Sequence, residues 1–203
     1  ATGPLTGFTA SNLPAGLTAA FDANLGALVI SGTPTTPGTS TVAFAASNLA
    51  GSGAGSLTLT IFNRYDAWAA QNFSTVELND PNLSGLLGDA TGAGIVNLLK
   101  YALSIPPHAP GFPAGLPVAG IQRFGGIDYL TLTYTRDKSA TDIALTVEVS
   151  ADLTTWNTGA GFTVEVSRTD NGNGTETVVT RDAIPQVSAA QRFIRLKAVQ
   201  IAP

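Results

Sequence analysis

The pattern of apolar and polar positions divides the chain into two β-rich parts around one segment of helical character. From residue 1 to about Asn63, apolar residues alternate with polar ones, as they do in half-buried strands. Turn-forming Gly and Pro residues separate the runs. The residues that share a strand face are Leu28 with Ile30, Val42 with Phe44, and Leu57 and Leu59 with Ile61. This part predicts a portion of a β-sandwich.

The pattern changes between residues 65 and 107. Within residues 89–107, apolar side chains recur at the 3.6-residue spacing of one helix face, at Ile95, Leu98, Leu99, Ala102 and Leu103. Pro106 and Pro107 end the pattern, because proline cannot continue a helix interior. Residues 65–73 predict a first, shorter helix. We therefore expect a small helical insert between the two β-rich parts.

Strand-like alternation returns after about residue 116. Six strands are expected, at residues 118–123, 129–136, 144–150, 162–168, 176–182 and 192–200. Residues 170–174, rich in Asn and Gly, form a natural hairpin tip, and Trp156 is expected in the core. The predicted fold class is mainly β, with two β-sandwich regions joined by a small α-helical insert. The predicted parts are residues 1–63, 64–115 and 116–203.

Composition narrows the classes of function. Charged residues make up only 12% of the 203 positions, about half the usual share, and the net charge is −4 without any basic cluster. Nucleic-acid binding therefore lacks an electrostatic basis. No apolar run reaches the ~18 residues that span a bilayer, so no membrane span is expected. The chain has no Cys, which excludes disulfides and cysteine-based metal sites. It has no Met and begins at Ala1, which indicates a processed or trimmed product of a longer precursor.

The first part carries three motifs of a known repeat: LPAGL at residues 13–17, ISGTPT at 30–35, and the strand at 39–48. It resembles the immunoglobulin-like repeat of bacterial surface proteins over about the first 62 residues. The resemblance implies an immunoglobulin-like sandwich. Because a complete repeat begins with further strands ahead of the LPAGL turn, the sandwich is expected to be incomplete.

An incomplete sandwich exposes unpaired backbone groups and an apolar groove that recruits a strand. Two alternatives stay open. In the first, the missing strand was trimmed away or the fold is a compact variant. In the second, a neighbouring copy donates a strand and the protein polymerises head to tail. The residues expected to line this self-association groove are Leu13, Leu17, Leu28, Ile30, Val42 and Phe44.

Residues 73–107 are similar to the DxDGDGxxNLLEYALGxDP segment of exported proteins from planctomycete and verrucomicrobial type bacteria. That resemblance implies a calcium loop of EF-hand or dockerin kind, in which Asp89 keeps position 1 and Asn97 keeps position 9. The acidic residues of positions 3, 5 and 12 are replaced by Thr91, Ala93 and Lys100. Calcium needs six or more oxygen ligands, so we expect a degenerate loop that holds no metal. Its glycines and Asp89 still suit a turn that caps a helix.

The last part resembles the C-terminal sandwich of the same exported proteins. The matching motifs are VEVSADLTTW at residues 147–156, the hairpin at 169–176 and the closing strand at 192–199. This resemblance implies an extracellular, non-catalytic tail.

The sequence contains no residue pattern typical of a catalytic site. His108 is the single histidine and lies in a Pro-rich stretch, and the acidic residues are scattered. No nucleophile-elbow pattern accompanies it. We therefore expect no enzyme activity, no metal and no cofactor. Glycan binding would need exposed aromatic rings, for which Trp68 and Trp156 are the candidates.

These inferences favour a structural subunit of an extracellular or cell-surface assembly, such as a filament, surface layer or adhesin. Its expected partner is another copy of the chain, joined by β-strand donation into a homo-oligomer or polymer. The alternative is a non-catalytic glycan-binding or sorting module of a secreted polysaccharide-degrading enzyme. Both alternatives predict a secreted or cell-surface location.

Overall fold

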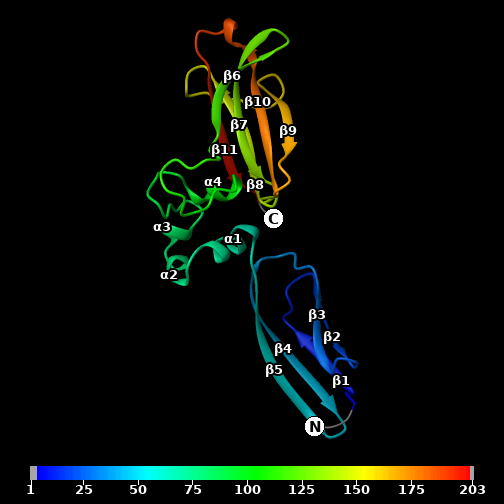
Figure 1. Ribbon diagram of the computed structural model, residues 1–203. Coiled ribbons are helices and arrows are strands. Elements are labelled where there is room, and N and C mark those ends of the chain that lie inside the picture. Colours follow the sequence, from blue (N-terminus) through cyan, green and yellow to red (C-terminus); the bar gives the residue numbers. More distant parts are fainter. Residues whose placement is uncertain (1–3, 202–203) are drawn as a thin grey trace. The chain divides into compact units, whose positions relative to one another are not determined.

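The computed structural model describes residues 4–201 and confirms a mainly β protein of antiparallel sheets with a few short helices. The chain divides into two compact units, one that ends at Asn63 and one that begins at Arg64 (Figure 1). Each unit is described by itself below.

The first unit contains five strands in two sheets. The three-stranded sheet has the order β1–β4–β5, and β2 pairs with β3 in a two-stranded sheet. Figure 1 shows β4 and β5 as a long hairpin. The strands are β1 (Gly7–Ser11), β2 (Leu17–Asp22), β3 (Ala27–Gly32), β4 (Gly38–Asn48) and β5 (Gly51–Ile61).

The register of β4 and β5 separates an apolar face from a polar one. Val42 lies opposite Leu57 and Phe44 opposite Gly55, while the alternate pairs, such as Thr41 with Thr58, lie on the other face. The apolar face is thinly covered. Within residues 4–63, Val42 is the only buried side chain. The first unit by itself therefore has almost no hydrophobic core.

The second unit begins with helices and continues as a sandwich. Its four-stranded sheet has the order β6–β7–β10–β9, and β11 pairs with β8. The helices are α1 (Arg64–Asn72), α2 (Thr75–Leu78), α3 (Pro81–Ser84) and α4 (Asn97–Ala102), with a short 3-10 turn at Gln186–Ser188. The strands are β6 (Val118–Phe124), β7 (Ile127–Asp137), β8 (Ile143–Ser150), β9 (Thr163–Asp170), β10 (Thr175–Pro185) and β11 (Phe193–Gln200).

Two buried clusters hold the second unit together. One joins the sheets to the chain after α4, through Leu103, Ile105, Leu132, Tyr134, Val147 and Val178. The other joins α1 and α4 to the start of β8, through Tyr65, Ala69, Phe73, Tyr101, Ala102, Ala140 and Ile143. The helical segment is therefore part of this core.

The strands expected after residue 116 all form, whereas the expected helix is shorter than its apolar pattern. Only Asn97–Ala102 is helical, because Gly92 and Gly94 adopt positive φ angles and hold residues 89–96 as a loop. Ser104, also with positive φ, ends the helix two residues before Pro106.

The expectation of Trp156 in the core is wrong. Its ring is half-buried beneath the guanidinium of Arg195, which lies 3.9 Å from the ring centroid.

Candidate self-association site

The outer edge of β5 is the longest unpaired strand edge in the described part of the first unit. β5 pairs with β4 along all eleven of its residues, and no other strand between residues 4 and 201 pairs with it. An edge strand presents a row of unpaired N–H and C=O groups that can hydrogen-bond another strand. β5 is long enough to offer a strong template for such pairing.

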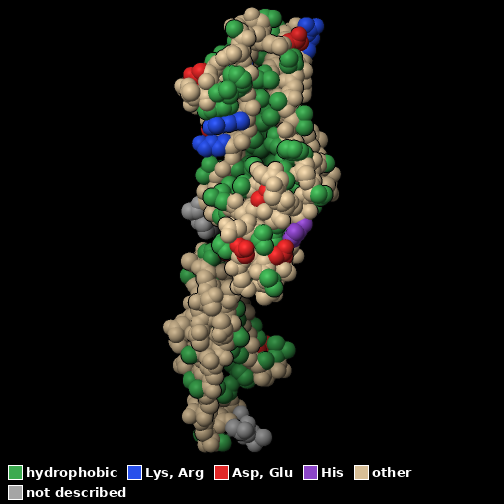
Figure 2. Space-filling view, turned by 90° about the vertical axis from the view of Figure 1, so that its left-hand side faces the viewer, with side chains coloured by type: hydrophobic (Ala, Val, Ile, Leu, Met, Phe, Trp, Pro, Cys, Tyr) green, Lys and Arg blue, Asp and Glu red, His purple; other side chains and the backbone are tan. Residues whose placement is uncertain are grey.

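Nothing in the sequence of β5 protects this edge. Proteins usually discourage edge pairing with charged side chains, proline or bulges. β5 contains neither a charged residue nor proline, and Asp22 is the only charged side chain in residues 1–63. In the space-filling view of Figure 2, blue and red gather on the second unit and hardly appear on the first. The edge therefore lacks electrostatic protection against pairing.

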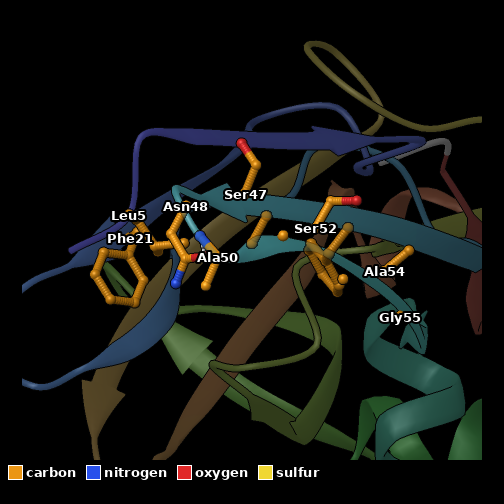
Figure 3. A pocket seen from close by; sticks show the side chains of 12 residues that line it. Leu5, Phe21, Ser47, Asn48, Ala50, Ser52, Ala54 and Gly55 are labelled. Carbon is orange, nitrogen blue, oxygen red and sulfur yellow. Dashed lines mark hydrogen bonds between the residues drawn. The ribbon is translucent and has the colours of Figure 1, made fainter. Parts of the chain in front are cut away.

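A groove of about 660 Å³ lies beside the first half of β5. Phe21 and Leu5 lie at one end of it and Ala54 and Gly55 at the other (Figure 3). The groove is hollow because β5 contributes only small residues here. A Cβ atom added to Gly53 or Gly55 would meet no atom within 4 Å. Side chains from another strand would fit into this space.

The six residues expected in the groove occupy different places. Phe44 lines it and stacks on Phe8, with ring centroids 6.5 Å apart. Val42 has no exposed surface. The remaining four are half-buried and lie on β2, β3 or the turn before β2, away from the groove lining: Leu13, Leu17, Leu28 and Ile30.

Sequence reasoning missed the contribution of β5 itself. In the sequence GSGAGSLTLTI, the residues at every second position are glycines in the first half and large aliphatic residues in the second. The strand period of two places all of them on one face. This regular change of side-chain size was the signal available in the sequence.

In the second unit, the loop of residues 89–96 surrounds the ammonium group of Lys100 with oxygen atoms. Lys100 is fully buried, and its Nζ donates to Asp89 Oδ1 at 2.8 Å, Thr91 Oγ1 at 3.3 Å and the Pro107 carbonyl at 2.9 Å. Two of these oxygens belong to Asp89 and Thr91, which were expected in the degenerate loop. The lysine therefore supplies a fixed positive charge inside the loop.

Asp89 is bound from several sides. It accepts hydrogen bonds from the Thr91 amide and hydroxyl and from the amides of Gly94 and Ile95. Burial by itself raises the pKa of Asp89, but the hydrogen bonds from Lys100, Thr91 and Gly94 outweigh it and hold that pKa well below its ordinary value. The carboxylate is therefore charged and already satisfied.

The side chain of Asn97, the third residue expected in the loop, hydrogen-bonds backbone carbonyl groups. Its side-chain amide donates to the carbonyls of Leu83 at 2.7 Å and Gly85 at 3.0 Å. These bonds fix the chain after α3 against the start of α4. Asn97 therefore ties the loop to the helices, whereas Asp89 and Thr91 contact the lysine.

The charged groups of the second unit lie mainly in ion pairs. Asp182 is buried and receives two hydrogen bonds from Arg192, and Glu148 pairs with Arg195 and Lys197. Across the described residues, no group of three or more His, Asp or Glu side chains is placed to hold a metal. These acidic residues therefore have structural partners.

His108 forms a local contact with the helical segment. Its Nε2 lies 2.8 Å from Glu77 Oε1. Glu77 also closes a capping box with Ser74. The hydrogen bonds from Ser74, followed by that from His108, lower the pKa of Glu77 to about 2. Ser74 and Glu77 therefore cap α2, and His108 is held beside this cap by its hydrogen bond with Glu77.

Neither tryptophan forms an open aromatic platform. Trp68 packs against Tyr65, Phe73 and Tyr101, with ring centroids 5.4 to 5.8 Å apart, and borders a shallow hollow of about 210 Å³. Trp156 is covered on one face by Arg195. Both rings are therefore occupied in packing.

Comparisons with protein-family models, with curated proteins and with solved structures gave no match. Among the helices within residues 4–201, none has the length and apolar character needed to cross a membrane.

Proposed function

We propose that this chain is a structural subunit of an extracellular or cell-surface assembly, such as a filament, surface layer or adhesin, and that its copies associate by β-strand donation at the first unit. The observation that carries the proposal is the unprotected edge of β5 beside a groove. A strand added at this edge would satisfy the backbone groups of β5 and cover the groove.

The burial pattern supports the same proposal. A domain of about 60 residues normally buries more than half of the surface of its unfolded chain. Here Val42 alone is buried among the described residues of the first unit, and Leu57 on β5 is 45% exposed. Apolar burial is the main stabilising contribution to folding. A partner strand would therefore add the apolar contacts that this unit lacks.

The low charge of the first unit lowers the cost of association. Charged groups must lose their hydration when they enter an interface, and interface cores are depleted of them. The polar face of the sheet carries Thr, Ser and Ala, whose desolvation costs less than that of a charge. This composition suits the close packing of many identical subunits.

The test is the mass of the purified intact chain by light scattering over a range of concentrations, together with electron microscopy. Gly55→Lys directs a charge into the groove, where the single unit has room for it. The matched control is Thr41→Lys, on the exposed polar face of the central strand β4. We expect the first variant to dissociate and the second to assemble. A monomeric parent chain at every concentration would contradict the proposal.

The glycan-binding alternative rests on the hollow beside Trp68, which Arg64 and Gln71 also line. Trp68 lines this hollow while its ring packs against three other aromatic rings. Retention of the folded chain on polysaccharide, lost in Trp68→Ala, would favour this alternative.

A further inference from the structure

Resting on the proposed function, we infer that the strand received by β5 is β5 of a second copy, in an antiparallel pair whose two-fold axis passes through Ser56. Ser56 is the middle residue of β5, which runs from Gly51 to Ile61. This register pairs all eleven residues of one strand with all eleven of the other. A shift by two residues in either direction would leave two residues of each strand unpaired.

The side chains of β5 are complementary in this register. Residues directly opposite in an antiparallel pair lie on the same face of the sheet. On the apolar face, the pairs across the two-fold axis are Gly51 with Ile61, Gly53 with Leu59, and Gly55 with Leu57. Each large aliphatic residue of one copy therefore lies over a glycine of the other.

The groove explains why this arrangement is favourable. It is lined by the three glycines of β5 together with Phe21, Phe44 and Ala46. The aliphatic half of the partner strand would lie along this lining and cover it. The two-fold axis repeats the contact, so both grooves fill at once and this interface by itself forms a closed dimer.

The polar face and the absence of charge are compatible with the same register. On that face Ser56 meets its own copy, Ala54 meets Thr58, and Ser52 meets Thr60. Thr and Ser form favourable cross-strand pairs. A shift by one residue would join the apolar face of one copy to the polar face of the other. The product of the full register is a continuous six-stranded sheet of order β1–β4–β5–β5–β4–β1.

Single cysteines test this register, because the chain has no Cys of its own. Opposite Cα atoms in an antiparallel pair lie about 4.5 to 5.5 Å apart, within the range that a disulfide spans. Ser56→Cys is therefore expected to shift the intact chain from the monomer to the dimer band in non-reducing electrophoresis after mild oxidation. Thr41→Cys, on the central strand β4, is the matched control and should stay in the monomer band of the same gel.

A mixed experiment fixes the register further. Ala54→Cys and Thr58→Cys should each stay unlinked alone and should cross-link when the two variants are mixed. Efficient linking of either one alone would overturn the register. If the parent chain assembles by light scattering while Ser56→Cys fails to link, this inference is wrong and the proposed function stands. If the parent chain does not assemble, both fail.

Discussion

Removing the buried ammonium of Lys100 should strongly destabilise the second unit. Lys100→Met keeps the length and apolar stem of the side chain and deletes its charge. Breaking a buried ion pair by removing one partner costs about 3–5 kcal/mol, because the other charge is left without compensation. Lys100 has no exposed surface, and the side chain of Asp89 is 16% exposed. The pair therefore belongs to the buried class.

The contacts indicate the lower part of that range. Asp89 would retain hydrogen bonds from Thr91 and Gly94, which lie 2.7 to 3.1 Å from its carboxylate oxygens. The Pro107 carbonyl, however, would lose the donor that now lies 2.9 Å away. We expect a loss of about 3 kcal/mol, which is a large fraction of the usual 5–15 kcal/mol of total stability.

Urea unfolding followed by tryptophan fluorescence is the suitable assay, because both tryptophans, Trp68 and Trp156, lie in the second unit. The control is Lys138→Met. Lys138 pairs with Asp170 at the same 2.8 Å distance, but both side chains are largely exposed. Exposed pairs contribute little, so the control should barely move the transition. Equal effects of the two variants would refute the argument that burial makes the Lys100–Asp89 pair contribute more to stability than an exposed pair.

Three further predictions concern the second unit. The native pKa of Asp89 lies below its unfolded value of about 4, so its stabilisation is fully present well above that value and is lost as the pH falls through and below it. The difference in unfolding free energy between the parent and Asp89→Asn should therefore shrink on acidification from about pH 5 to about pH 2. Arg192→Met should cost about 3–5 kcal/mol in urea unfolding, because Asp182 is fully buried and would lose both of its bonds to that guanidinium. Tyr101→Phe should cost about 1.5–3 kcal/mol in the same assay, since the phenol donates at 2.7 Å to the buried carboxylate of Asp142.

The alternation of apolar and polar residues predicted the β-strands well. This pattern repeats every two residues in a strand, and pairing with one neighbouring strand is enough to form the sheet. The alternation placed Val42 with Phe44 on one strand face and Leu57 with Leu59 on another, and the structure then pairs Val42 with Leu57. The helix at residues 89–107 was overestimated for a related reason. Apolar residues can pack into a core from a loop as well as from a helix. Gly92 and Gly94 adopt positive φ angles, which favour a loop here.

The site was harder to predict because it depends on which strands remain unpaired. The sequence indicates that Phe44 and Leu57 are apolar strand residues, but the lack of a partner for β5 is a property of the sheet order. The buried position of Lys100 depends likewise on contacts from outside its helix, above all the Pro107 carbonyl. Lysine side chains are mostly exposed in proteins, so nothing in the composition indicated that Lys100 would be buried.

The central claim is that copies of this chain associate through β5. Light scattering of the intact chain from low to high concentration tests it most directly, with Gly55→Lys measured beside it. We expect a mass of two or more chains for the parent and of one chain for the variant. A parent chain that keeps the mass of one copy at every concentration would contradict it.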